Sequence, residues 1–166
     1  GPETQPDGEV DDTYIADVLR VLGVIAEGFG VTLLVETNGV YADTKRLRAL
    51  LDNIGSKGVA ALWDMHHPYR FFNESPEETI ANIGAYIKHV HIKDSLYENG
   101  ILEYQLMGDG DMPIREMLDC LYSIGYDGYV SLEWVKRWAM ELSDAGVVVP
   151  RFAAYMHEYI EEKEQE

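Results

Sequence analysis

The sequence contains little cysteine, few basic residues and no long apolar run. Its single cysteine, Cys120, excludes an internal disulfide and is typical of a protein from a reducing compartment. No segment approaches the roughly 20 apolar residues of a membrane-spanning helix, and no basic segment followed by an apolar one resembles a secretion signal. We therefore expect a cytoplasmic protein that does not insert into a membrane.

The shortage of basic residues makes the chain strongly acidic. Thirteen lysines and arginines stand against 30 aspartates and glutamates, which gives a formal net charge of −17. A chain of this charge repels polyanions, so nucleic acid and anionic membrane surfaces are excluded as expected partners. Divalent cations and neutral or weakly charged small molecules remain compatible with it.

The composition indicates one globular domain. The chain has 166 residues, of which 46% are hydrophobic and 11% aromatic, enough to build a core. Residues 1–10 are polar, with two prolines and two glycines, and read as a loop or linker. We expect the folded domain over residues 11–160 and an acidic tail over residues 161–166.

Helix and strand patterns alternate along the chain. Apolar residues at three- and four-residue spacing predict helices over residues 11–28, 43–54, 75–87, 113–121 and 149–162. Short aliphatic runs predict strands over residues 31–36, 59–64, 89–93 and 129–133, and residues 94–112 are expected to form a long loop. Asp43, the capping box from Ser75 to Glu78, and Gly55 supply specific start and stop signals.

This order predicts an α/β fold of parallel β/α units. Strands that alternate with helices through short connections pair in parallel with right-handed crossovers. Four such units make half of an eight-stranded TIM barrel, whose usual length is roughly 250 residues. An open flavodoxin-like sheet is the alternative, but the phosphate loop that it usually carries near its start is absent.

Each predicted strand carries, at or near its carboxyl end, a residue that can bind a metal. These residues are Glu36, Asp64, His91 and Glu133. Active sites of parallel β/α folds lie at the carboxyl ends of the strands. A single carboxylate there is most often a helix cap or a solvated loop residue, but four in four strands indicate one site for a divalent metal. Three oxygens and one nitrogen favour Mn²⁺, with Mg²⁺, Co²⁺ or Zn²⁺ as alternatives.

Four segments carry a family resemblance: Val35-Glu-Thr-Asn-Gly39, Trp63-Asp-Met-His-His-Pro68, His89-Val-His-Ile-Lys-Asp94 and Ser131-Leu-Glu-Trp134. In order and spacing they resemble the C-terminal half of the xylose-isomerase-like, endonuclease-IV-like barrel superfamily, and within it the sugar phosphate isomerases and epimerases. The resemblance spans residues 11–159. It implies that Glu36, Asp64, His91 and Glu133 bind one divalent metal, and that His67 contacts substrate oxygens.

The same resemblance implies an isomerase or epimerase that acts on a sugar or sugar-like polyol. Proton transfer next to a metal-bound carbonyl is the expected chemistry, with Glu36 and Glu133 as catalytic bases. Lys93 lies on the same strand face as His91 and is a candidate substrate contact, although an ion pair with Asp94 or Glu133 is an equal alternative. His66 and Trp134 are further substrate-contact candidates, with packing as the alternative for each.

The sequence departs from this family in three respects. Full members are about twice as long, so we expect a fragment, a homo-oligomer, or a partner chain that supplies the missing half-barrel. Ketose 3-epimerases carry an arginine where this chain has Tyr97. Residues 97–110 contain no histidine, so the trinuclear zinc site of endonuclease IV cannot form in the same way. A lyase or dehydratase acting on a keto-inositol or keto-glycoside, and a non-catalytic half-barrel subunit, remain alternative functions.

Overall fold

A computed structural model describes residue 6 and residues 8–165 of the chain. Its elements, in chain order, are α1 (Asp12–Gly28), β1 (Leu33–Glu36), the 3-10 turn η2 (Gly39–Ala42), α2 (Thr44–Ile54), β2 (Val59–Asp64), α3 (His66–Phe72), α4 (Pro76–Ile83), the 3-10 turn η3 (Gly84–Tyr86), β3 (Ile87–Ile92), β4 (Asp94–Glu98), β5 (Ile101–Gln105), α5 (Ile114–Ser123), β6 (Val130–Leu132) and α6 (Ala145–Gln165).

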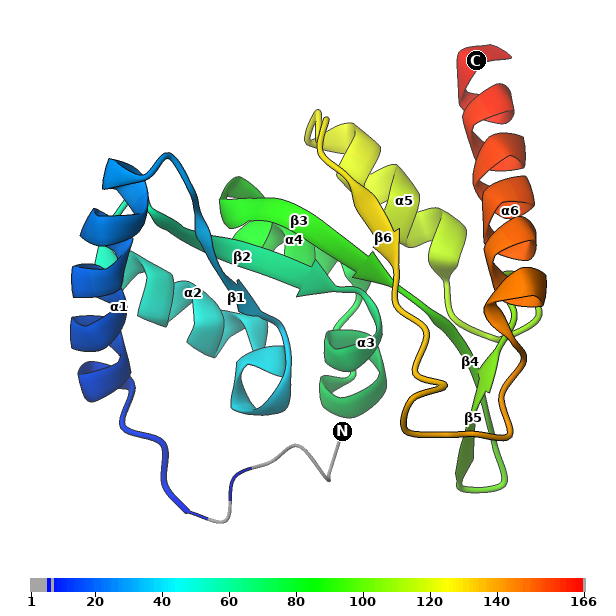
Figure 1. The fold of residues 1–166 in the computed structure, drawn as a ribbon, viewed down its shortest axis with the longest axis horizontal. Coiled ribbons are helices and arrows are strands. Elements are labelled where there is room, and N and C mark those ends of the chain that lie inside the picture. Colours follow the sequence, from blue (N-terminus) through cyan, green and yellow to red (C-terminus); the bar gives the residue numbers. More distant parts are fainter. Residues whose placement is uncertain (1–5, 7, 166) are drawn as a thin grey trace.

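The main sheet consists of four parallel strands in the order β1-β2-β3-β6 (Figure 1). Its register pairs Asp64 with His91 and Ile92 with Leu132, so the carboxyl ends of neighbouring strands meet along one edge. Two of the loop residues that follow continue the sheet hydrogen bonds, since the Met65 N–H donates to the His91 carbonyl and the Glu133 N–H to the Ile92 carbonyl. The predicted parallel β/α fold is confirmed.

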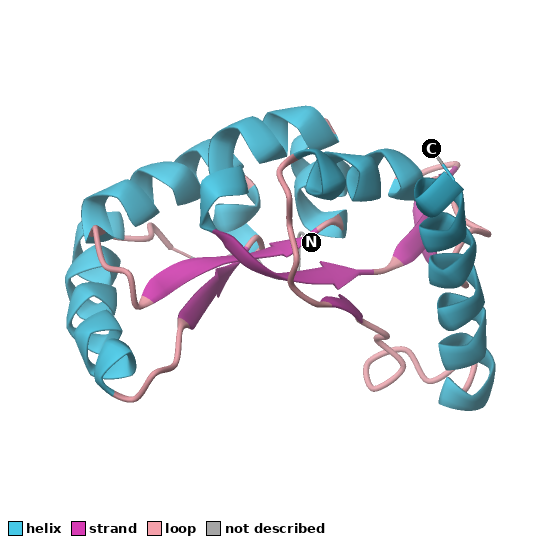
Figure 2. Ribbon diagram, turned by 90° about the horizontal axis from the view of Figure 1, so that it is seen from above, coloured by secondary structure: helices cyan, strands magenta, loops and turns pink. Residues whose placement is uncertain are grey.

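Helices cover one face of this sheet in an arc, and the opposite face is concave (Figure 2). The core lies between the sheet and the arc, and Trp63, Val90 and Ile92 from the strands are at most 1% exposed there. Leu34, on the concave face, is 37% exposed. The helices α1 and α6 stand at the two ends of the arc (Figures 1 and 2). A sheet covered on one side by consecutive helices has the form of half a β/α barrel.

Local sequence signals account for the helix boundaries. The Asp11 carboxylate accepts from the Thr13 and Tyr14 N–H groups, and Asp43 caps α2 in the same way. Ser75 and Glu78 form the predicted capping box at α4, with Pro76 in the first turn. Gly55 ends α2 with φ of 61°, a conformation that favours glycine.

The structure differs from the predicted elements in several places. Ile87 belongs to β3 and not to the helix before it, because η3 turns the chain at Gly84–Tyr86. The predicted loop over residues 94–112 contains the antiparallel hairpin β4–β5, and the short helix α3 follows β2. Helix α6 starts at Ala145 and runs through the expected acidic tail to Gln165.

Two further predictions concern the ends of the chain and its relation to membranes. Of the expected N-terminal loop over residues 1–10, positions 1–5 and 7 lie outside the described residues, and the others are in no helix or strand. None of the helices in the described ranges is long and apolar enough to cross a bilayer.

Candidate metal centre

The four predicted ligands come together at the carboxyl edge of the sheet. Glu36 ends β1, Asp64 ends β2, His91 is the fifth residue of β3, and Glu133 follows β6 directly. Each offers one donor atom, and these atoms all lie within 4.8 Å of one another. The strand order explains the convergence, because four adjacent parallel strands present their last side chains at one edge of a curved sheet.

Thr37 fixes the position of Asp64. This threonine is fully buried, and its hydroxyl donates to the Asp64 carbonyl oxygen at 3.0 Å while it accepts from the Asp64 N–H at 2.8 Å. The Asp64 side chain is fully buried as well, and its Oδ1 accepts from the His66 N–H at 2.9 Å. The end of β1 thus holds the end of β2, and the carboxylate orientation is set by the first turn of α3.

Glu36 and His91 form a hydrogen-bonded pair across the sheet. The His91 Nδ1 and the Glu36 Oε1 are 3.1 Å apart. This hydrogen bond lowers the pKa of Glu36 and raises that of His91, in each case against the opposing effect of burial. The geometry therefore favours a charged carboxylate at Glu36.

Lys93 supplies a positive charge between two of the carboxylates. Its side chain is almost completely buried, and its Nζ contacts both the Asp64 Oδ2 and the Glu133 Oε2. Burial disfavours the ammonium, but the charges of Asp64 and Glu133 outweigh it and raise the pKa of Lys93. With the three carboxylates ionised, −3 from Glu36, Asp64 and Glu133 plus +1 from Lys93 leaves a net charge of −2.

This net charge and donor set fit a divalent cation. A partly buried cluster with excess negative charge is stabilised when a cation neutralises it, and a charge of +2 balances −2. Carboxylate oxygens and an imidazole nitrogen suit Mn²⁺ and Mg²⁺, and thiolates, which favour zinc in structural sites, are absent from the cluster. The four side chains could hold such an ion without contributions from other residues of the described chain.

His66 and His67, which follow Asp64 after one residue, have different surroundings. The His67 Nε2 lies 3.4 Å from the Asp64 Oδ2, and burial lowers the pKa of this ring to about 3. His66 is fully buried, its Nε2 lies 3.0 Å from the Ser95 hydroxyl, and burial lowers its pKa to about 2. Both rings are therefore neutral at physiological pH, and only His67 reaches the open space beside the cluster.

A cleft of about 1250 Å³ opens next to the four ligands. His67, Lys93 and Glu133 line its inner end. Its walls come from α3, from the β4–β5 hairpin and from the loop after β6, and they carry the aromatic side chains Tyr69, Phe71, Tyr97, Tyr104 and Trp138. The cleft thus joins the candidate metal centre to a largely aromatic surface.

The comparisons with known proteins point to one family. The family described as xylose isomerase-like TIM barrel matches residues 1–155. The chain belongs to this family. The confirmed half-barrel architecture and the predicted resemblance agree with that assignment.

Relatives of this xylose isomerase-like chain include sugar epimerases. Fructoselysine 3-epimerase of Escherichia coli O157:H7 is 26% identical over 132 residues, which cover 76% of this chain and 47% of that enzyme. Among solved structures, an L-ribulose 3-epimerase superposes with a TM-score of 0.80 at 17% identity, over 98% of this chain and 59% of that one. A xylose isomerase-like TIM barrel protein from Mycobacterium smegmatis in complex with magnesium gives a TM-score of 0.61 at 21% identity, over 78% and 47% of the two chains.

The two solved structures, at 17% and 21% identity, share the fold of this chain. The xylose isomerase-like chain also spans about half the length of the curated relatives it matches.

The remaining predicted site residues lie in different positions relative to the cleft. Lys93 forms ion pairs with Glu133 and Asp64 rather than with Asp94. Trp134 does not line the cleft, and its indole N–H donates to the Ser143 carbonyl at 2.8 Å. His67 therefore lines the cleft, whereas His66 and Trp134 do not, and a substrate contact stays a prediction for all three. Trp63, the neighbour of Asp64, is 1% exposed in the core.

The sequence patterns did not predict the aromatic residues that line the cleft away from the metal ligands. Tyr97 and Tyr104 lie on the hairpin that was expected as loop, although the Asn99-Gly100 turn between its strands is a strong hairpin signal. Both turn residues have positive φ, 53° and 83°, as this type of turn requires. Thr37, the residue that positions Asp64, gives no signal in a single sequence, since a threonine at a strand end is common.

Proposed function

We propose that this chain contributes the metal-binding half of a sugar isomerase or epimerase active site. One observation carries the proposal: Glu36, Asp64, His91 and Glu133 converge to within 4.8 Å at the edge of the sheet where barrel enzymes place their chemistry. The sugar epimerases among the relatives support the reaction class. Mn²⁺ is the ion that we propose, and Mg²⁺ is the alternative that the donor set also suits.

Glu36, Asp64, His91 and Glu133 would hold the ion. A divalent cation supplies electrostatic stabilisation of the negative charge that a substrate carbonyl develops when the adjacent carbon loses its proton. The chain itself supplies the bases for that proton transfer. Glu36 and Glu133 come from the two outermost strands of the sheet, and we propose that they reach a substrate carbon from opposite sides.

Opposed carboxylates suit epimerisation. One carboxylate removes the proton from one face of the substrate carbon, and the other returns a proton to the opposite face, which inverts the configuration. The Lys93 ammonium holds the Glu133 Oε2 in place, and the His91 ring holds the Glu36 Oε1. The neutral His67 ring at the inner end of the cleft is positioned to hydrogen-bond a substrate hydroxyl without adding charge.

We further propose that a second half-barrel completes the site. The strands β1 and β6 each have one unpaired edge among the described elements, and exposed sheet edges are rarely left bare in natural proteins. The second half would come from further chain, from a second copy or from another protein. It would cover the concave face and enclose the substrate.

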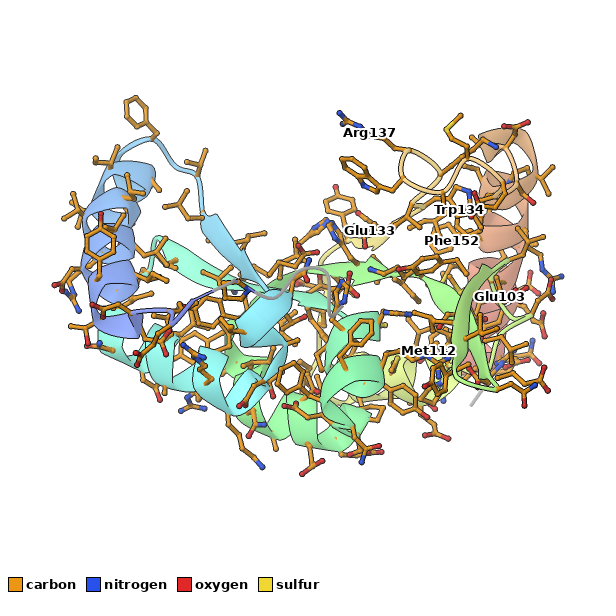
Figure 3. The ribbon with its side chains drawn as sticks, turned by 90° about the horizontal axis from the view of Figure 1, so that it is seen from below. Glu103, Met112, Glu133, Trp134, Arg137 and Phe152 are labelled. Carbon is orange, nitrogen blue, oxygen red and sulfur yellow. The ribbon has the colours of Figure 1, made fainter. Side chains whose placement is uncertain are left out.

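Solvent exchange and metal content test the reaction proposal. The full chain is loaded with Mn²⁺ and incubated in deuterium oxide with L-ribulose or fructosyl-lysine, and deuterium uptake at carbon is followed by NMR. We expect uptake that falls by about 10²- to 10⁴-fold in Glu36→Gln and in Glu133→Gln, because each variant lacks a base. Glu103→Gln, on the hairpin (Figure 3), is the matched control and should exchange normally.

Bound metal is measured in parallel by mass spectrometry. His91→Ala and Asp64→Asn should lose most of the metal that the wild-type chain retains after dialysis, because each removes a donor from the cluster. Unchanged metal content in both variants would contradict the metal site. Exchange that persists in both glutamine variants would contradict the assignment of the bases.

A further inference from the structure

The outer part of the cleft presents aromatic side chains to solvent. Trp138, on the loop after β6, is 78% exposed, and Tyr97, on β4, is 56% exposed. Phe71 and Tyr104 line the same cleft. Exposed aromatic rings that cluster at the mouth of one cleft differ from scattered surface apolar residues, and such clusters mark binding sites.

The cations of the cleft are already neutralised. Among the described residues that line it, the charged side chains are Arg70, Lys93 and Glu133. The Arg70 guanidinium is bound by the Ser95 hydroxyl at 2.9 Å, by the Ser95 carbonyl at 2.7 Å and by the Asp111 carboxylate. Lys93 is held by Asp64 and Glu133. A phosphate or carboxylate would have to compete with Asp111 for Arg70, or with Asp64 and Glu133 for Lys93, so the cleft favours an uncharged substituent.

The aromatic wall of β4 is held in a fixed place. The Tyr97 N–H faces the Asp111 Oδ2 at 3.4 Å, and Asp111 is in turn paired with Arg70 from α3. At the base of the hairpin, the Asp94 carboxylate accepts from the Gly108 and Gly110 N–H groups at 2.9 and 3.0 Å. A wall that is ordered before binding loses little entropy when it receives a ligand.

We propose that the outer cleft is a subsite for an uncharged ring joined to the reacting sugar, either a second sugar ring or an aryl group. The substrate is then a neutral glycoside or conjugate and not a phosphorylated ketose. This inference rests on the proposed function for the identity of the reacting group. Aromatic side chains stack on flat or apolar ring faces, and 1250 Å³ exceeds the roughly 300–1,000 Å³ of typical small-ligand sites, which leaves room beyond one sugar.

Calorimetric titration of the full chain tests the subsite. The titrations are run in EDTA, so that they do not depend on metal chemistry, with methyl β-glucoside, phenyl β-glucoside, cellobiose and glucose 6-phosphate as probes. We expect the phenyl glucoside and cellobiose to bind about tenfold more tightly than the methyl glucoside, because one stacked ring adds favourable contact. Glucose 6-phosphate should bind most weakly.

Matched variants locate the ring. Trp138→Ala and Tyr97→Ala should each reduce the affinity for the ring-bearing probes by about three- to tenfold and leave the methyl glucoside unchanged. Met140→Ala is the control, since Met140 is 73% exposed on the same loop and does not line the cleft. Circular dichroism is used to check that each variant is folded. Because the two substitutions lie on separate walls of the cleft, the test can be made with either variant if the other does not fold.

Three results would overturn the proposal: equal affinity for the phenyl and methyl glucosides, ring affinity that neither aromatic variant changes, or tighter binding of the phosphate. The outcome is separable from that of the proposed function. Ring discrimination without any solvent exchange would retain the subsite and contradict the reaction. Solvent exchange without ring discrimination would support the reaction and contradict the subsite.

Discussion

His66 shows how burial decides the charge of a single residue. Its ring is fully buried beside the positively charged Lys93 and Arg70, and burial above all lowers its pKa to about 2. The ring contacts Ser95 through Nε2 and packs against His67, Phe71 and Tyr104. These contacts are those of a packing residue, the alternative that the sequence left open for it.

A buried neutral histidine makes stability depend on pH. In the unfolded chain the ring gains a proton below its ordinary pKa of about 6.5, whereas in the folded chain it stays neutral down to about pH 2. The unfolded state therefore binds more protons as the pH falls, and the free energy of unfolding decreases. We expect His66 to account for a loss of about 1 kcal/mol between about pH 7.5 and pH 5.5, measured by urea denaturation in EDTA.

The variant His66→Gln should lose less stability than the wild type over this pH range. His157→Gln, at an exposed position on α6, is the matched histidine-to-glutamine control. His91 acts with the opposite sign, since its raised pKa stabilises the folded chain at low pH, but it is present in all three proteins and cancels in the comparison. Parallel pH curves for wild type and His66→Gln would contradict the prediction.

At the scale of elements, one turn connects the hairpin to α5. The buried Asp94 carboxylate accepts N–H groups from Ser95, Gly108 and Gly110, although burial raises its pKa. Gly110 has no space for a side chain, because a Cβ would stand 2.1 Å from the Asp94 Oδ1 and 2.4 Å from the Ser95 carbonyl oxygen. The glycine is therefore needed for close approach to the carboxylate.

Gly110→Ala should destabilise the chain by about 1–3 kcal/mol, since the backbone of the turn must shift away from Asp94. Gly146→Ala is the control: no atom lies within 4 Å of a Cβ there, and alanine in a helix is neutral or stabilising by up to about 1 kcal/mol. Urea denaturation gives the two free energies, and hydrogen exchange should show lost protection in β4 and β5 of Gly110→Ala. Equal stability of the two variants would contradict this account of the turn.

The sequence allowed the strand ends to be predicted because their pattern is local. An aliphatic run followed by a carboxylate or histidine marks both the strand and the edge where its last side chain lies, as at Val59–Asp64. Parallel pairing then brings the four ends together without further information. The capping signals at Asp43 and Ser75 are local in the same sense, and the structure confirms them.

Other features depend on contacts between distant residues. Lys93 has equal sequence reasons to pair with Asp94 or with Glu133, and the position of β3 between β2 and β6 places its ammonium between Asp64 and Glu133. The seven-residue helix α3 shows no clear periodicity, and Pro68 in its first turn reads as a loop residue. The hairpin β4–β5 could have been predicted from the sequence, because Asn99-Gly100 is a local turn signal.

At the scale of the molecule, α1 has an unusual distribution of apolar residues: small ones are buried and several larger ones are exposed to solvent. Its small residues Ala16, Gly23 and Ala26 are buried against the rest of the chain. Larger apolar residues of the sequence pattern that predicts this helix remain exposed, at 38% for Val18, 42% for Leu22 and 51% for Ile25. Phe29, the C-cap residue of α1, is 80% exposed, and β1, the next strand of the chain, has an unpaired edge among the described elements.

This surface predicts association through the α1 end of the half-barrel. We expect purified chain to form a dimer of twice 18.8 kDa, because covering the apolar face and the β1 edge removes both from water. The net charge of −17 opposes the contact between two copies. Raising NaCl from about 50 mM to about 500 mM should therefore strengthen it, as salt screens the repulsion.

Light scattering after size exclusion measures the mass of each variant. Val21→Glu and Phe29→Glu place a charge on the apolar surface and should give monomers at both salt concentrations, whereas Tyr122→Glu on α5, where the tyrosine is 68% exposed, should leave the dimer intact. A monomeric wild-type chain in high salt would exclude a second copy as the missing half. The concave face and the cleft would then have to be covered by a different polypeptide segment, and the proposed active site would depend on it.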